Sequence, residues 1–295
     1  MDPAVIGLVA ASALLHVGWN VRLKTAGDPL VAAAIGLVVG GLLVVPLGIL
    51  AWWLDGRPAL PVEGVGLGLL SGLLEAVYFV FLAAAYRRGD LSVVYPIARG
   101  TAPLLLVAVG VVLLGERLGG PGWLGVVGLI AGFLVLQRPW LALRAAAARQ
   151  RPDGPIAFAL ATGVAIAAYT SVDRVGTRLI DPIPYAAILW ASGATLLVAW
   201  IVLRDGRGAL RPGPAAVRQA SIGGVMTLGA YLLILYALSV APLTAVAPLR
   251  ESATVVAAAW GAVRLGEAVG RGEALRRIAG SVLIVAGAVL LALDG

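Results

Sequence analysis

Ten apolar segments, each about 20 residues long, divide almost the whole chain between them. A helix of about 20 mostly apolar residues is long enough to cross the hydrocarbon core of a bilayer. Short polar breaks, or breaks marked by Pro and Gly, separate the segments. We place the spans near residues 3–23, 29–53, 64–86, 91–114, 119–137, 155–173, 183–203, 221–239, 243–264 and 273–293.

Composition supports an assignment to the membrane. The chain is 61% hydrophobic and 13% charged, whereas a soluble domain is roughly half apolar. Every backbone amide inside the hydrocarbon needs an internal partner, and the sequence lacks the alternating segments of about ten residues that build a barrel. We therefore predict an all-α integral membrane protein with ten transmembrane helices.

Cysteine is absent, which excludes disulfides, thiolate metal sites and thiol nucleophiles. The first apolar run has no basic residue ahead of it, because Arg22 and Lys24 follow it, so we expect no cleaved signal peptide. The net charge of +7 is carried by loops between the spans. This location favours a role in membrane topology over binding of nucleic acid.

The positive residues are shared unequally between two sets of loops. The loops after spans 2, 4, 6 and 8 carry four, namely Arg57, Arg117, Arg174 and Arg178. The loops after the odd-numbered spans carry sixteen: Arg22, Lys24, Arg87, Arg88, Arg138, Arg144, Arg149, Arg151, Arg204, Arg207, Arg211, Arg218, Arg264, Arg271, Arg276 and Arg277. The positive-inside rule places this larger set in the cytoplasm, so both termini are predicted to lie outside it.

The two halves of the chain repeat one plan. Residues 91–116 read LSVVYPIARGTAPLLLVAVGVVLLGE, and residues 243–267 read LTAVAPLRESATVVAAAWGAVRLGE. Each half holds five spans, and because five is odd the halves insert with opposite orientation. Many secondary transporters have this plan, with the substrate site near the midplane between the repeats. We assign residues 1–139 to the first five-helix repeat, 140–154 to a linker and 155–295 to the second repeat.

Several motifs resemble the EamA branch of the drug/metabolite transporter superfamily: ALLHVGWNVRLK, AAYRRGDLSVVYPIARGTAPLLL and LGERL, then APLRESATVVAAA and LGE. The resemblance covers nearly the whole chain and implies ten helices in two inverted five-helix repeats. It also implies transport of amino acids, amines, nucleotide-linked metabolites or drugs. Where related sequences carry a histidine in a pattern like LLHxxY, this chain has Glu75 in LLEAVY, a departure that bears on coupling or substrate choice.

Two arginines lie deep within predicted spans. Arg99 lies about 13 Å into its span and Arg250 about 12 Å, near the middle of a core about 30 Å thick. An arginine at the centre of a bilayer costs from about 3 to more than 10 kcal/mol, so each needs a partner, a water-filled cavity or a ligand. Each is either a clamp on Glu75, Glu251 or backbone carbonyls, or a contact for the substrate or coupling ion. We favour the second interpretation, because repeat symmetry brings both arginines toward one central cavity.

Glu75 lies halfway along its span, with Tyr78 three residues later on the same face. A carboxyl group at this depth is either paired with an arginine or carries a proton near neutral pH. Both states suit a carrier coupled to protons. Glu251 is next to Arg250 but points about 100° away around the helix, so its alternative role is to brace a neighbouring span.

The first span places His16, Trp19 and Asn20 along one stripe, because their spacing is i, i+3 and i+4. His16 titrates near neutrality and could carry protons, or it could be held by a neighbouring helix. Trp19 either stacks on a ligand or is an ordinary interfacial aromatic residue.

In the second half, Tyr169 and Asp173 form a corresponding i, i+4 pair. Asp173 either contributes to the site or forms an interfacial ion pair with Arg174. Tyr95, one turn before the first buried arginine, and Tyr231 complete the candidate wall of the cavity.

Two glutamates, Glu116 and Glu267, occupy equivalent positions in the LGE motifs. We expect them to bind neighbouring helix ends or to fix loops rather than to contact substrate. The small residues of GLVVGG (36–41) and GLGLLSG (66–72) predict close packing between helices, because such spacing lets backbones approach.

These patterns predict a secondary active transporter that moves a small polar or zwitterionic metabolite across the cytoplasmic membrane by alternating access. The expected substrate is amino-acid-like, an amine or of phosphonate type, with protons as the coupling ion and export favoured over import. We expect no cofactor or metal, no nucleic-acid partner, and a monomer or weak dimer. A GxxxxGK[ST] loop is absent, which argues against direct use of ATP. The alternatives are a membrane-embedded enzyme acting on lipid head groups, although HExxH and DxxD runs are lacking, and a passive channel.

Overall fold

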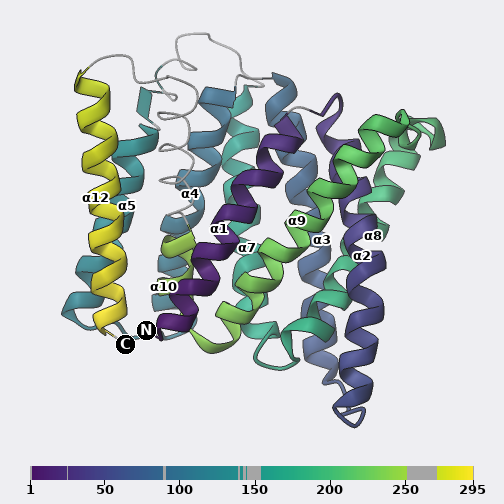
Figure 1. Cartoon of the computed structure of the whole chain (residues 1–295), viewed down its shortest axis with the longest axis horizontal. Coiled ribbons are helices and arrows are strands. Elements are labelled where there is room, and N and C mark those ends of the chain that lie inside the picture. Colours follow the sequence, from purple (N-terminus) through teal and green to yellow (C-terminus); the bar gives the residue numbers. More distant parts are fainter. Residues whose placement is uncertain are drawn as a thin grey trace.

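The computed structural model describes residues 2–24, 26–88, 91–138, 140–141, 144, 154–250 and 271–294. Within these ranges all regular structure is helical, and the helices form one bundle (Figure 1). The first half contributes α1 (Pro3–Lys24), α2 (Pro29–Leu54), α3 (Val62–Arg88), α4 (Leu91–Val112) and α5 (Gly120–Gln137). The second half contributes α7 (Pro155–Gly176), α8 (Pro182–Asp205), the short 3₁₀ helix η1 (Arg207–Leu210), α9 (Pro214–Val240), α10 (Leu243–Arg250) and α12 (Arg271–Asp294).

Five helices, α2, α3, α7, α8 and α9, are long and apolar enough to cross a membrane. Shorter apolar segments lie in α1, α4, α5 and α12. Large apolar side chains on the outside of the bundle are exposed, for example Leu42 at 70% and Leu203 at 85%. Water would disfavour such a surface, whereas lipid tails accommodate it. The prediction of an all-helical membrane protein is therefore confirmed.

Both chain termini lie at the same end of the bundle (Figure 1). We call this the termini end; it also holds the α4–α5 loop (113–119) and the α9–α10 turn (241–242). The other end, which we call the distal end, holds the α1–α2 turn and the α8–α9 connection (206–213).

Glycines let helices from the two halves approach closely, as the small-residue segments predicted. Between α2 and α9, a Cβ added to Gly36 would lie 3.2 Å from the Cα of Gly224. Between α3 and α8, a Cβ added to Gly72 would lie 2.5 Å from the carbonyl oxygen of Leu189. These backbone contacts bring the polar residues of different helices within reach of one another.

Two Asp-Pro pairs, Asp28-Pro29 and Asp181-Pro182, stand at the starts of α2 and α8, because proline suits the first position of a helix. Asp28 caps α2 by accepting hydrogen bonds from the amides of Leu30 (2.9 Å) and Val31 (3.2 Å). Asp181 precedes α8 without a side-chain cap. The two aspartates thus have different local roles.

Candidate functional site

A narrow polar cavity lies at the centre of the bundle, between the two halves. Helices α1 and α3 form one wall, and α7, α9 and α10 form the other. We call it the central cavity, and it leaves about 20 Å³ for the centre of a water-sized sphere. Its polar and aromatic wall residues are Ser12, His16, Trp19, Glu75, Tyr78, Phe79, Tyr169, Thr227, Tyr231 and Arg250.

Glu75 places a carboxyl group on the α3 wall and is only 5% exposed. Its Oε2 atom is buried without a hydrogen-bond partner among the described residues. Buried polar atoms in native proteins are nearly always paired, so this oxygen is positioned to meet water, a proton or a ligand.

Arg250 brings a positive charge to the same cavity from α10 and is also buried. Its guanidinium carbon lies 5.7 Å from the centre of the Tyr231 ring, within the range of a cation–π contact. Arg250 also interacts electrostatically with Glu75 and with Asp173. The cavity therefore brings a guanidinium group and a buried carboxyl group into one confined space.

Asp173 is fully buried beside the cavity and accepts hydrogen bonds from hydroxyls of three other helices. Its Oδ1 accepts hydrogen bonds from Ser71 Oγ (2.5 Å) and from the hydroxyl of Tyr185 (2.9 Å). Its Oδ2 accepts a hydrogen bond from the hydroxyl of Tyr231. The alternative of an ion pair with Arg174 is wrong. The Arg174 side chain faces a different partner.

That partner is Glu116, and the two residues form what we call the latch at the termini end. Arg174 Nε lies 3.4 Å from Glu116 Oε1, with side chains 8% and 9% exposed. Glu116 also accepts the first amides of α10, from Leu243 (2.6 Å) and Thr244 (2.8 Å), while Arg174 donates to the carbonyl of Leu238 (2.5 Å). The expectation that Glu116 binds a neighbouring helix end is confirmed.

On α1, the indole nitrogen of Trp19 donates to Nδ1 of His16 at 3.0 Å, and the two rings meet edge to face. A neutral His16 therefore carries its proton on Nε2. Ser12, one turn earlier, donates to the carbonyl of Ala230 (2.7 Å) and joins α1 to α9. Trp19 is 6% exposed and lines the cavity, so its ring is placed where a bound molecule could contact it.

Aromatic rings form a continuous wall across the site. Tyr78 meets Tyr169 with ring centres 5.8 Å apart, Tyr169 meets Tyr231 at 6.0 Å, and Tyr231 meets Trp190 at 5.5 Å. Aromatic faces carry a partial negative charge that attracts organic cations. The wall therefore suits a substrate with an ammonium group.

Seven of the predicted site residues line the central cavity: His16, Trp19, Glu75, Tyr78, Tyr169, Tyr231 and Arg250. Asp173 adjoins it through its bond with Tyr231. The side chains of Asn20, Tyr95 and Arg99, and the whole of Glu251 and Glu267, lie outside the described residues.

Four hydroxyl residues at or beside the cavity were not predicted: Ser12, Ser71, Tyr185 and Thr227. A single Ser or Thr in an apolar helix commonly bonds its own backbone, as Thr227 does to the carbonyl of Gly223. For Ser71, the sequence did offer a signal, because this residue lies in the small-residue segment 66–72 that predicts close helix packing.

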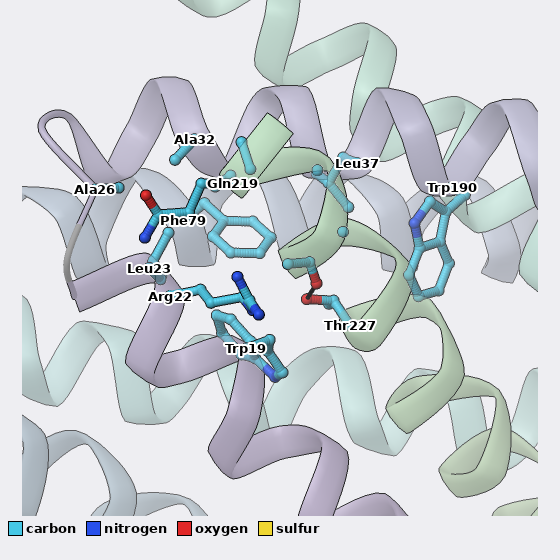
Figure 2. A pocket seen from close by; sticks show the side chains of 15 residues that line it. Trp19, Arg22, Leu23, Ala26, Ala32, Leu37, Phe79, Trp190, Gln219 and Thr227 are labelled. Carbon is cyan, nitrogen blue, oxygen red and sulfur yellow. Dashed lines mark hydrogen bonds between the residues drawn. The ribbon is translucent and has the colours of Figure 1, made fainter. Parts of the chain in front are cut away.

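Two further cavities continue from the central cavity toward the distal end. The first, which we call the apolar chamber, shares Trp19, Phe79 and Thr227 with the central cavity (Figure 2). The second is a wide opening, the vestibule, which shares residues of α2 and α9 with the chamber. A separate groove at the termini end shares no lining residue with the central cavity.

Comparison with known proteins identifies the family. The model of the EamA-like transporter family matches residues 4–138 and 154–293. The uncharacterized protein PA1977 of Pseudomonas aeruginosa is 31% identical over 248 residues, which are 82% of this chain and 78% of that protein. The spermidine export protein MdtI of Shigella flexneri is 39% identical over 70 residues, only 24% of this chain and 64% of MdtI.

A solved crystal structure has the same fold, with a TM-score of 0.71 at 22% identity over 99% of this chain and 98% of that one. The family match takes in most of the chain as two segments and confirms the resemblance seen in the motifs. The chain belongs to the EamA-like transporter family.

Proposed function

We propose that the chain is a secondary active transporter that moves a small zwitterion or amine across the cytoplasmic membrane by alternating access. The observation that carries the proposal is the central cavity, which lies between the two halves and holds Glu75 and Arg250 in its walls. The proposed architecture has ten spans in two inverted repeats, residues 1–139 and 155–295, joined by the linker 140–154.

The substrate class follows from the charges of the cavity. Glu75 receives an ammonium group or a proton, and Arg250 receives a carboxylate by paired hydrogen bonds. The tyrosine wall covers the cationic end of the substrate. A carrier of this kind agrees with the membrane-transport role of the family and with the export of an amine by the relative MdtI.

Alternating access is supported by the unequal ends of the cavity. The latch closes the termini end, together with Asp173 and its three hydroxyl partners. The apolar chamber and the vestibule instead lead toward the distal end. The sixteen-to-four distribution of positive residues assigns the distal end to the cytoplasm. The described conformation then corresponds to a carrier accessible from inside the cell.

Proton coupling is assigned to Glu75. In proteoliposomes, Glu75→Gln should remove uptake driven by a pH gradient but retain part of the counterflow exchange, because an amide keeps the shape but releases no proton. The control is Glu63→Gln, at the exposed start of the same helix. Unchanged concentrative transport by Glu75→Gln would reduce Glu75 to a structural residue. Single-channel current, in place of saturable exchange, would identify a channel instead.

Orientation has its own test. A reporter that is active only in the cytoplasm should give no signal when fused after Gly295 and a strong signal when inserted at Arg149. The charge distribution predicts this result. A strong signal at Gly295 would reverse the proposed orientation without affecting the repeat.

We extend the site to Asn20, Tyr95, Arg99 and Glu251 on the basis of sequence position alone. If Arg99 holds an anionic group of the substrate, Arg99→Lys should fold normally but bind roughly tenfold more weakly, because lysine lacks the two-pronged geometry. If it instead clamps Glu75, Arg99→Ala should lose stability that Glu75→Gln restores. Melting temperatures and affinities of the single and double mutants distinguish the two roles.

A further inference from the structure

The route from the distal end to the central cavity narrows sharply along its length. The vestibule leaves about 640 Å³ for the centre of a water-sized sphere, whereas the apolar chamber leaves about 30 Å³ and the central cavity about 20 Å³. A cavity needs roughly 10–15 Å³ on this measure to hold one water molecule, so each inner space has room for one or two. Water can therefore carry protons along this route, but a metabolite passes only when side chains move.

Trp19 lies where the two inner spaces meet. Its buried side chain lines both the chamber and the central cavity, as do those of Phe79 and Thr227 (Figure 2). The indole N–H of Trp19 donates to Nδ1 of His16 at 3.0 Å. The histidine therefore holds a ring that forms part of the wall at the narrow part of the route.

This hydrogen bond exists in only one protonation state of the histidine. An indole N–H can donate but not accept, so Nδ1 of His16 must be without a proton. An imidazolium carries a proton on both ring nitrogens, and its Nδ1 would then turn one donor toward another. Protonation of His16 therefore breaks the bond and leaves the buried indole N–H of Trp19 without this acceptor.

Other ionisable groups face the same space as His16 from the surrounding helices. Among the described residues that line the two inner cavities they are Arg22 on α1 itself, Glu75 and Tyr78 on α3, Tyr169 on α7, Tyr231 on α9 and Arg250 on α10. The described lining residues of α2 and α8 are not ionisable, and Asp173 lies behind Tyr231. Tyrosine and arginine ordinarily keep their protonation state between about pH 5 and 8. The titration of Glu75 and Asp173 must therefore be distinguished from that of His16.

We propose that His16 and Trp19 form a proton-operated switch on the route between the distal end and the central cavity. When His16 is neutral, its hydrogen bond holds the indole at the narrow part of the route. When His16 is an imidazolium, the indole is released, and its ring turns aside and widens the route. The inference rests on the proposed transport function and adds a second protonated group to it: Glu75 acts inside the cavity, whereas His16 controls access to it.

The chain has a single histidine, so NMR of the wild-type protein gives the first test. Protein with nitrogen-15 in its histidine and tryptophan side chains is titrated in detergent from about pH 5 to about pH 8. Neutral His16 should be the Nε2–H tautomer, and the indole signal of Trp19 should move as the imidazolium forms. Trp19→Phe assigns that signal by removing it. An Nδ1–H tautomer, a histidine that stays neutral throughout, or an indole signal that ignores the imidazolium would each overturn the switch.

Variants then identify the group to which the indole responds. His16→Gln offers an amide oxygen to the indole N–H of Trp19 but takes up no proton, so the indole signal should stay constant with pH. Glu75→Gln and Asp173→Asn remove the competing carboxyl groups and should keep the response. A response that survives in His16→Gln, or that disappears in either carboxyl variant, would assign the titration to another group and reject the switch.

Access to the central cavity gives the conformational readout. Because the chain has no cysteine, Ala230→Cys, which lines the central cavity alone, can be compared with Ala32→Cys, where the chamber meets the vestibule. The ratio of their labelling rates with a polar thiol reagent corrects for the reagent's own dependence on pH. The ratio should rise about fivefold as His16 becomes charged, which is the factor that one net hydrogen bond is worth.

The same ratio should be independent of pH when His16→Gln or Trp19→Phe is added to both cysteine variants. A ratio that is independent of pH in the otherwise unchanged chain would make the His16–Trp19 bond a static packing contact. A ratio that still rises in the Trp19→Phe background would place the moving group elsewhere, and either result would reject the switch.

The switch and the proposed transport function fail separately. Gradient-driven exchange in proteoliposomes, by a protein whose Trp19 signal ignores pH, would preserve the transporter and reject the switch. A Trp19 signal that follows the protonation of His16, in a protein that exchanges no solute, would preserve the switch and reject the transporter.

Discussion

The two ends of the central cavity are held by different kinds of interaction. At the termini end, the buried side chains of Asp173, Arg174 and Glu116 bond hydroxyls, backbone amides and a carbonyl from several helices. At the distal end, small side chains of α2 and α9 surround open space, and the ion pair of Arg87 with Asp28 is substantially exposed. A directional polar network closes one end, whereas glycine and alanine leave room at the other.

This difference has an energetic counterpart. Removing one partner of a buried ion pair costs about 3–5 kcal/mol, whereas exposed pairs contribute about 0.2–1 kcal/mol. The termini end is therefore a set of contacts that must break together, which suits a gate with two discrete states. Among the described residues, the distal end holds the exposed ion pairs Arg87–Asp28 and Arg204–Asp205.

The difference between the two ends is tested most directly by labelling single cysteines with a thiol reagent. We expect nearly complete reaction at the distal end and almost none at the termini end. The chain has no cysteine, so single-cysteine variants have no background. Ala32→Cys, on the shared wall of the chamber and vestibule, should react readily with a polar maleimide. Ala237→Cys, which is fully buried on α9, should not.

The control for reagent access at the termini end is Ala4→Cys, an exposed position near the start of α1. Comparable reaction rates at positions 32 and 237 would remove the distinction between an open and a closed end. Mass spectrometry of the labelled protein gives the rates directly.

The largest expected loss of stability comes from Glu116→Ala. It leaves two amides of α10 without their acceptor and Arg174 buried without its carboxylate, so the expected loss is about 3–5 kcal/mol. Melting in detergent should fall by several degrees, and labelling of Ala237→Cys in the same chain should rise. The control Glu63→Ala, at an exposed position, should melt like the wild type.

A double mutant separates the ion pair from the helix cap. If Arg174 is buried mainly to meet Glu116, then adding Arg174→Met to Glu116→Ala should recover part of the lost stability, because no unpaired charge remains. A fully additive loss would instead show that the two residues stabilise the termini end independently.

Asp173→Asn should have an intermediate effect, about 1.5–3 kcal/mol, because hydrogen bonds to a charged acceptor are the stronger ones. An amide has one acceptor oxygen, so either Tyr231 or the pair of Ser71 and Tyr185 must face an NH₂ donor. Tyr185→Phe removes a single donor and should cost about 1 kcal/mol. Equal melting temperatures for the two variants would argue against a three-hydroxyl cluster.

A place inside the helical bundle could be predicted from the sequence, because it follows from the position within an apolar run. Glu75 and Arg250 were both expected at mid-span, and both line the central cavity. The bond between Glu116 and a helix end was also expected, since its motif follows an apolar run at a loop. The all-helical fold followed from the length of the apolar segments.

The partners of Asp173 could not be predicted in this way, because they are set by contacts between distant helices. Tyr185 reaches Asp173 because Gly176 leaves space, and a Cβ there would lie 2.2 Å from the tyrosine ring. The apolar chamber was likewise not predicted, since it depends on where Gly223 lies after α9 packs on α2. Sequence spacing describes one helix at a time, whereas these features belong to pairs of helices.

The smallest effects should occur at the distal end, where Asp28 both caps α2 and pairs with Arg87 at 3.2 Å. Asp28→Ala removes the acceptor for two amides and should cost about 1 kcal/mol, as other N-cap losses do. Arg87→Ala leaves the cap intact and removes only an exposed ion pair, so its cost should be below about 0.5 kcal/mol. Asp181→Ala, at the equivalent position without a side-chain cap, is the control for Asp28→Ala and should change little. If Arg87→Ala instead destabilised the protein as much as Glu116→Ala, the distal end would be held by charge as firmly as the termini end, and the proposed difference between them would be lost.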